Sequence, residues 1–176
     1  MTLSIVQTFL IVDGYNIINA WEGLKTLSEE NLEQARDALV TTIENYIQLK
    51  GYRGIVVFDA YNNDEGIVET SRGNLKVVYT KKNQTADSYI ERLIQEIERV
   101  HEVYVATSDF MIQRMVMSAG GIRMSARELQ IDIQYAQKTS AEKVKKEIEQ
   151  QADRLSERLD EQTAKRLVDL FQNKNK

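Results

Sequence analysis

The sequence of 176 residues contains no cysteine, no proline and only one histidine, His101. The absence of cysteine excludes disulfides, zinc–thiolate sites, iron–sulfur clusters and a thiol nucleophile. A single histidine excludes a two-histidine nuclease mechanism and a cluster of histidine metal ligands. The polar chemistry that remains depends on carboxylates, hydroxyls, amides, Lys and Arg, together with any metal ion that they bind.

Long hydrophobic runs are also missing. The apolar-rich stretch of residues 3–12 is far too short to span a membrane, and it lacks the basic segment and the cleavage site of a signal peptide. We interpret this stretch as a buried strand. Because cysteine and a targeting segment are both absent, we expect a cytoplasmic protein. The motifs GxxxxGKS/T, GxGxxG and GxSxG do not occur, which argues against a P-loop, a dinucleotide site and a serine hydrolase.

The charge is acidic overall but uneven along the chain. The net charge is −4, and residues 138–176 carry ten Lys and Arg against eight Asp and Glu. Residues 1–137 carry thirteen basic and nineteen acidic side chains, a net charge of −6. An acidic body of this kind can still bind phosphates if some of its acids hold divalent cations, because the metal ion inverts the local sign of the charge.

Short apolar runs alternate with helical patterns along the first three quarters of the chain. The runs at residues 9–12, 55–58, 75–79 and 103–106 are typical of buried parallel strands. Apolar residues at three- and four-residue spacing predict helices over residues 32–47 and 90–100, and a shorter helix after Asp109. The sequence therefore predicts an α/β fold with a parallel sheet of four to five strands flanked by helices, residues 122–124 being the fifth strand.

Two capping boxes predict helix starts in the last third of the chain. Ser125 and Glu128 form the first box, and Thr139 and Glu142 form the second. The helix expected after the second box is long and charged, with too few apolar residues to fill a core. The polar stretch of residues 62–74 contains two glycines and is interpreted as a loop.

Three acids follow predicted strands, and a fourth lies in the first turn of a predicted helix. Asp13, Asp59 and Asp109 come after residues 9–12, 55–58 and 103–108, and Asp87 follows Thr85 and Ala86. Ligands of an open parallel sheet bind beyond the carboxyl ends of its strands, so the four carboxylates are expected to meet at one edge. Each acid alone has an alternative role as a helix cap.

Four carboxylates at one edge repel each other unless cations neutralise them. Mg²⁺ or Mn²⁺ is the cation expected to neutralise them, because both ions prefer oxygen ligands and keep several bound waters. Such an ion can activate water and stabilise the charge of a phosphodiester under attack. This pattern favours metal-dependent hydrolysis without histidine or cysteine.

Four segments in this order resemble a known family. Residues 12–16 (VDGYN), 57–60 (VFDA), 85–87 (TAD) and 106–109 (ATSD) are similar to the motifs of NYN domains in the PIN-like ribonuclease superfamily, and most similar to those of its YacP-type branch. That branch includes a bacterial ribosome-associated endoribonuclease that cleaves mRNA in the A site. The resemblance covers about residues 9–129 and implies a three-layer sandwich, with residues 1–137 as the nuclease domain. Residues 138–176 depart most from a minimal NYN domain, and we interpret them from their composition as a helical extension.

The resemblance also implies roles for individual residues. Asp13, Asp87 and Asp109 are expected to hold Mg²⁺ or Mn²⁺, with Asp59 in the same pocket. Asn16 is expected to orient a water or a phosphate, and Ser108 to contribute a hydroxyl at the rim.

RNA binding requires cations for the phosphates and aromatic surfaces for the bases. Lys81, Lys82, Arg123 and Arg127 are close in sequence to the acids and are the expected phosphate contacts. Tyr15 is the expected base contact. Trp21 and Tyr61 are further aromatics near strand ends, for which packing is at least as good an interpretation.

The leading hypothesis is thus a metal-dependent endoribonuclease that acts on single-stranded RNA, specifically mRNA on the ribosome. One alternative is a non-catalytic PIN-like module that binds RNA or ribosomes. A second is a phosphohydrolase for small substrates, which is disfavoured because Tyr15 stands where an aspartyl-phosphate enzyme has a second Asp.

Overall fold

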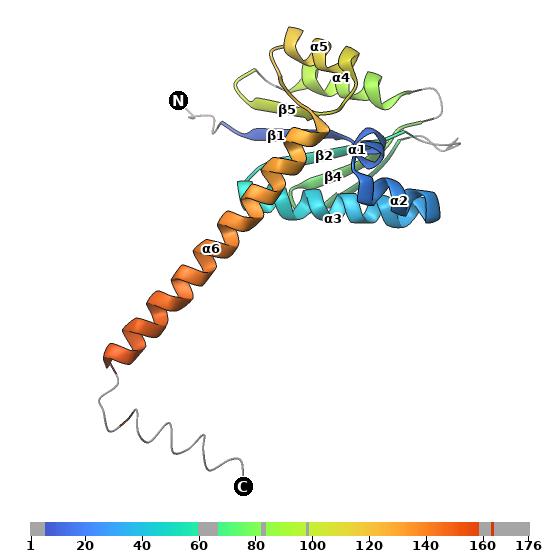
Figure 1. The fold of residues 1–176 in the computed structure, drawn as a ribbon. Helices are drawn as coiled ribbons and strands as arrows, with labels where there is room; N and C mark the ends of the chain where they lie inside the picture. Colours follow the sequence, from blue (N-terminus) through green and yellow to red (C-terminus); the bar gives the residue numbers. More distant parts are fainter. Residues whose placement is uncertain (1–5, 60–66, 82–83, 98, 159–162, 164–176) are drawn as a thin grey trace. The chain divides into compact units, whose positions relative to one another are not determined.

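The computed structural model describes residues 6–59, 67–81, 84–97, 99–158 and 163. Within these ranges, strands and helices alternate along most of the chain (Figure 1). The strands are β1 (Thr8–Asp13), β2 (Arg53–Phe58), β3 (Val68–Arg72), β4 (Leu75–Tyr79), β5 (Glu102–Ala106) and β6 (Ile122–Met124). The helices are α1 (Gly14–Ala20), α2 (Glu22–Glu30), α3 (Leu32–Lys50), α4 (Ala86–Glu96), α5 (Phe110–Ser118) and α6 (Ala126–Arg158).

The strands form one sheet in the order β3-β4-β2-β1-β5-β6. Every neighbouring pair is parallel except β3 and β4, which are antiparallel. The prediction of an α/β fold is confirmed, and all five predicted strands are present. β1 lies between β2 and β5, so the carboxyl ends of these three strands are direct neighbours.

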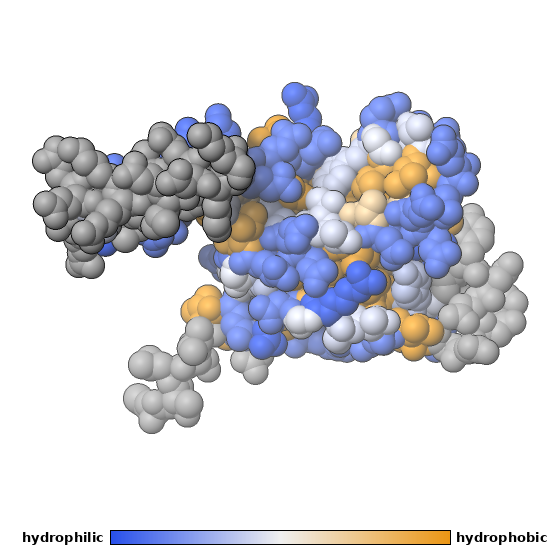
Figure 2. Space-filling view, turned by 90° about the horizontal axis from the view of Figure 1, so that it is seen from below, coloured by the Kyte–Doolittle hydropathy of each residue, from blue (hydrophilic) through white to orange (hydrophobic). Residues whose placement is uncertain are grey.

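Helices cover both faces of the sheet and make three layers (Figure 1). α4 and α5 lie on one face, while α1, α2 and α3 lie on the other. A hydrophobic core lies on each face of the sheet, and successive residues of β1 point into one core and then the other, because side chains alternate along a strand. Leu10 and Val12 pack with α3, and Ile11 packs with α4 and α5. The surface around α2 and α3 is mostly hydrophilic, with smaller apolar patches (Figure 2).

The first turns of α6 belong to the same body as the sheet. Leu129 and Ile133 are buried in the core on the α3 side. Asp132 accepts hydrogen bonds from the Tyr46 hydroxyl and from Lys50 Nζ at 3.3 Å, which ties α6 to α3. The capping box at the start of α6 is confirmed, since Glu128 accepts from the Ser125 amide at 2.7 Å and the Ser125 hydroxyl accepts from the Glu128 amide at 3.2 Å.

The structure corrects three details of the predicted elements. Residues 68–72 are not loop but the edge strand β3, which turns into β4 at Gly73 with a φ of 57°. The second capping box starts no helix, because Thr139 and Glu142 lie inside the continuous helix α6. α1 and α2 were not predicted, and they fill residues 14–30 between the first strand and α3.

The chain divides into two compact units, residues 1–137 and 138–176. The first unit contains the whole sheet, α1 to α5 and the start of α6. In the second unit, every residue from 141 to 154 is exposed, and Lys145 pairs with Glu149 at 3.9 Å along the helix. No described helix in either unit has the length and apolar character needed to cross a bilayer.

Candidate active site

Four carboxylates come from the carboxyl-terminal edge of the sheet. Asp13 is the last residue of β1, Asp59 follows β2, and Asp109 follows β5 and precedes α5. Asp87 lies in the first turn of α4, which begins after β4. Because β2, β1 and β5 are adjacent, the fold brings the acids together at the edge where parallel sheets bind ligands.

Asp13 is the most buried of the four, with 8% of its surface exposed. Burial raises the pKa of its carboxyl group to about 6, and the negative charges of Asp87 and Asp59 add to that effect. Hydrogen bonds from the Thr107 hydroxyl and the backbone amide of Asn16 lower the pKa of Asp13 and partly offset this rise. At the end of β1, the Asp13 carboxylate is thus buried among negative charges and is oriented by two hydrogen-bond donors.

Asp87 shows that the acids share one electrostatic environment. Its pKa is raised, first by burial and then by the charges of Asp109 and Asp59. Among the described residues, none of the four acids forms an ion pair with Lys, Arg or His. The edge therefore carries negative charge that no described protein cation neutralises.

Asp109 is the N-cap of α5, and Asp59 accepts from the first amide of α4, whose N-cap is Thr85. Asp59 Oδ1 accepts from the Ala86 amide and, at 3.4 Å, from the Thr80 hydroxyl. Asp109 Oδ1 accepts from the amides of Met111 and Ile112 at 2.7 and 3.2 Å. In both residues the described contacts use only one carboxylate oxygen. Both acids therefore stabilise helix starts, and their contacts with the described residues leave Oδ2 for a ligand.

Thr107 links two of the acids and was not predicted as a site residue. Its side chain is fully buried, and its hydroxyl donates to Asp13 Oδ2 at 3.1 Å and accepts from the Asp109 amide at 3.0 Å. Its carbonyl oxygen accepts from the Gln113 side chain at 2.8 Å. The available signal was its place between a buried strand and a cap, where a threonine hydroxyl commonly bonds nearby backbone.

Asn16 and Ser108 lie on neighbouring loops of the same edge. Asn16 Oδ1 accepts from the Ser108 amide at 2.6 Å, which joins α1 to the segment between β5 and α5. The Ser108 residue itself is exposed. Position 14 requires glycine, because a Cβ atom there would lie 2.3 Å from the Phe58 ring. Of the predicted site, Asn16 thus has a clear positioning contact and Ser108 a position at the rim.

The predicted RNA contacts have different surroundings. Lys81 is exposed after β4, at the same edge as the acids, and Arg127 is exposed in the first turn of α6. Arg123 is paired with Glu128 at 3.2 Å. Lys82 lies outside the described residues, as does Tyr61.

The two described aromatics near strand ends are engaged within the protein. Tyr15 is partly buried against Phe58, with ring centroids 5.2 Å apart, and the Arg36 guanidinium lies 5.8 Å from its ring centre. Trp21 is buried and its indole N–H donates to the Ala126 carbonyl at 2.9 Å. Trp21 is therefore a packing residue that joins α1 and α6.

The acids do not form a closed metal cage. No three His, Cys, Asp or Glu side chains within the described ranges lie close enough together to hold one ion. Their chemistry nevertheless suits Mg²⁺, which binds through one or two carboxylates and completes its shell with water and substrate phosphate. The neighbouring negative charges that raise the pKa values of Asp13 and Asp87 also create a negative potential that attracts such an ion.

Comparison with known proteins shows the family of the chain. The YacP-like NYN domain family matches residues 10–172 of the chain. The chain belongs to the YacP-like NYN domain family. This family is a branch of the PIN-like nucleases, as the motifs at residues 12–16, 57–60, 85–87 and 106–109 indicated.

Members of the YacP family from Bacillus subtilis are similar in sequence and in fold. YacP of strain 168 is 38% identical over 138 residues, which cover 78% of this chain and 81% of that protein. A crystal structure of a mutant of Rae1 (YacP) has a TM-score of 0.68 and 37% identity, covering 81% of this chain and 85% of that one. A second crystal structure of Rae1 has a TM-score of 0.67 and 33% identity, with coverage of 93% and 92%.

Proposed function

We propose that this protein is a metal-dependent endoribonuclease that cleaves single-stranded RNA. The observation that carries the proposal is the set of coupled carboxylates Asp13, Asp59, Asp87 and Asp109 at the ligand-binding edge of a PIN-like nuclease fold. The chain has no cysteine and a single histidine, which limits the alternatives for hydrolytic chemistry.

The divalent ion, Mg²⁺ or Mn²⁺, would bind to one or two of the four carboxylates Asp13, Asp59, Asp87 and Asp109, with water and substrate phosphate completing its shell. When bound, this ion lowers the pKa of a water molecule and stabilises charge on the phosphodiester. Thr107 and the Asn16 amide keep the Asp13 carboxylate in a fixed orientation. Asp109 is fixed by the first turn of α5, and Asp59 by the first turn of α4. The remaining donors at the rim, the Asn16 side-chain Nδ2 and the Ser108 hydroxyl, would orient a water or a phosphate oxygen.

RNA would approach across this edge with its phosphates near exposed cations. Lys81 and Arg127 are the best placed of the predicted contacts because both are exposed. We assign Arg123 a weaker role, since Glu128 already neutralises part of its charge.

The natural substrate would be mRNA on the ribosome. The support is the charge distribution, since residues 138–176 have a net charge of +2 while residues 1–137 have −6. An extension with a net positive charge is attracted to ribosomal RNA. The body would then perform the cleavage and the extension would provide the recruitment.

A non-catalytic RNA-binding module is the second candidate. The observation that favours it is that Asp59 and Asp109 already bind the first amides of helices and that no three described acids converge on one point.

Incubation of end-labelled single-stranded RNA with the full chain, in Mg²⁺, in Mn²⁺ and in EDTA, separates the candidates. We expect internal cuts that require the metal. RNA that is bound but never cut would support the non-catalytic module, and phosphate release from small esters alone would indicate a phosphohydrolase.

A further inference from the structure

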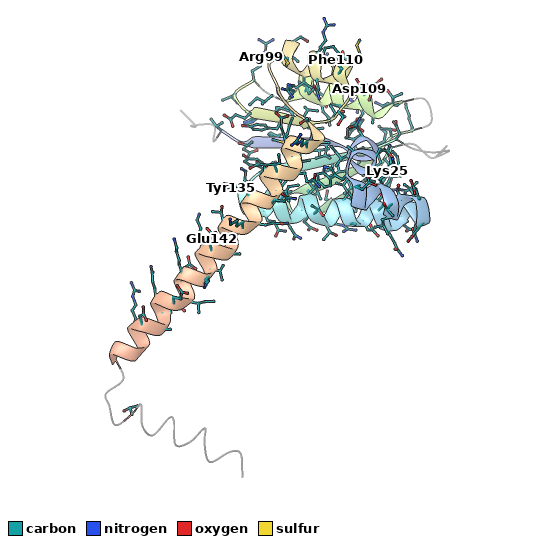
Figure 3. The ribbon with its side chains drawn as sticks, viewed as in Figure 1. Lys25, Arg99, Asp109, Phe110, Tyr135 and Glu142 are labelled. Atoms are coloured by element: carbon teal, nitrogen blue, oxygen red, sulfur yellow. The ribbon has the colours of Figure 1, made fainter. Side chains whose placement is uncertain are left out.

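The start of α5 presents a large aromatic side chain to solvent directly beside the acidic edge. Phe110 is the first residue of α5 and is 67% exposed. It directly follows Asp109, one of the four carboxylates of the acidic edge. Figure 3 labels both residues at this end of the helix. The residues that anchor α5 in the core are instead Ile112 and Val116. Phe110 therefore contributes little to the packing of the helix.

A cation lies next to this ring. The Arg114 guanidinium carbon is 5.9 Å from the centre of the Phe110 ring, at the distance of a cation–π contact. Residues 110, 114 and 117 follow each other at helical spacing and share one face of α5. Met117, on the last turn of that face, is 60% exposed. The face thus combines an aromatic surface and a positive charge, starting at the acid cluster.

Other described aromatics around the acids do not offer a comparable surface. Phe58 is fully buried, Tyr15 packs against it edge-on, and Tyr79 stacks on it. Phe110 is also held in place, because Asp109 fixes the first turn of α5 through two amide hydrogen bonds. A ring on a fixed helix turn, one residue from a carboxylate of the site, is placed to contact whatever lies across that site.

We propose that Phe110 stacks against an unpaired base of the RNA bound at the acidic edge, while Arg114 contacts the backbone of the same strand. The inference rests on the proposed function and adds a positioning residue to it. Aromatic stacking is available to every base, so this contact selects single strands over duplexes without selecting a sequence. Arg114 adds a cation suited to phosphate, which distinguishes the face from a purely apolar protein-docking surface.

The test uses the full chain and a single-stranded RNA that contains 2-aminopurine, whose fluorescence falls when it stacks. In Mg²⁺, with the fluorescence read immediately after mixing and before cleavage, the wild-type protein should quench the fluorescence on binding. Phe110→Ala should lose the quenching and bind about tenfold more weakly, whereas Phe110→Trp should retain both. Met117→Ala is the matched control, because it shortens an exposed side chain about 10 Å along the same helix face, and it should behave as the wild type.

Cleavage assays in Mg²⁺ distinguish the two proposals. We expect Phe110→Ala to raise the KM for single-stranded RNA about tenfold and to leave kcat nearly unchanged, and a melting curve to show an intact fold. If the wild type cleaves RNA and Phe110→Ala binds and cleaves it equally well, the stacking inference is overturned and the nuclease proposal stands. If the wild type neither binds nor cleaves single-stranded RNA, both are overturned.

Discussion

The buried carboxyl group of Asp13 makes the stability of the protein depend on pH. Its pKa rises from 3.8 to about 6 on folding, so the folded protein binds this proton more tightly than the unfolded chain. The stabilisation from the protonated form is complete below pH 3.8 and is lost as the pH rises through about 6. At neutral pH, the ionised group therefore destabilises the fold.

Asp13→Asn removes this cost and keeps the shape of the side chain. In EDTA at pH 8, we expect the variant to be more stable than the wild type by up to about 3 kcal/mol, and near pH 4 the difference should vanish. Urea denaturation at the two pH values measures it. An equal difference at both values would mean that ionisation of Asp13 is not its cause.

Thr107 offers a second test at the residue scale, because its hydroxyl is the direct link between Asp13 and Asp109. Thr107→Val leaves both partners with an unsatisfied contact and should cost about 1–3 kcal/mol in unfolding free energy. The position of Asp13 would loosen, and cleavage should fall about 10- to 100-fold. Thr107→Ser keeps the hydroxyl and is the control. A Val variant as active as the Ser variant would remove Thr107 from the site.

The sequence allowed the acids to be predicted but not the way they are held. Asp13, Asp59 and Asp109 were identifiable because each follows an apolar run that can only be a buried strand. Thr107 also follows an apolar run, but its importance depends on a hydrogen bond to a residue 94 positions away, which the run does not reveal. The exposure of Phe110 could not be predicted from the sequence either, because it depends on how α5 is rotated against the sheet.

At the scale of elements, strands that are buried on both faces were the most predictable. β1, β2, β4 and β5 are apolar runs because helices cover both sides of the sheet. β3 is exposed along its whole length, so no apolar pattern marks it. A capping box is informative only where a helix actually starts, and the same residue types occur at Thr139 inside α6.

The two boxes provide a matched experiment on α6. Ser125→Ala removes the cap of a real helix start and should lower the unfolding free energy by about 1 kcal/mol. Thr139→Ala changes the corresponding position of the second box, which lies within the helix, and should change it by less than about 0.5 kcal/mol. Thermal or chemical denaturation compares them. A larger loss for Thr139→Ala would show that a helix boundary lies at residue 139 after all.

The whole molecule combines an acidic body and a basic extension with different expected tasks. Residues 1–137 include every α6 residue in the buried core, whereas residues 141–154 are all exposed. A chain that ends at Gln137 should therefore fold and cleave naked RNA at close to the full-length rate. Its co-sedimentation with ribosomes should weaken, and the remaining binding should depend less on salt because cationic contacts are lost.

Circular dichroism, RNA cleavage and sucrose-gradient sedimentation of the truncated chain measure these three properties. A truncated protein that unfolds or precipitates would show that the extension completes the core. A truncated protein that folds and sediments with ribosomes as fully as the intact chain would assign recruitment to residues 1–137 instead.

The central claim is that the acidic edge cleaves RNA, and single-turnover cleavage by Asp13→Asn tests it most directly. The substitution is expected to stabilise the fold at neutral pH, so lost activity cannot be ascribed to unfolding. With Mg²⁺ and end-labelled single-stranded RNA, we predict a cleavage rate at least about 100-fold below that of the wild type, with RNA binding retained. Cleavage by Asp13→Asn at the wild-type rate would contradict the account.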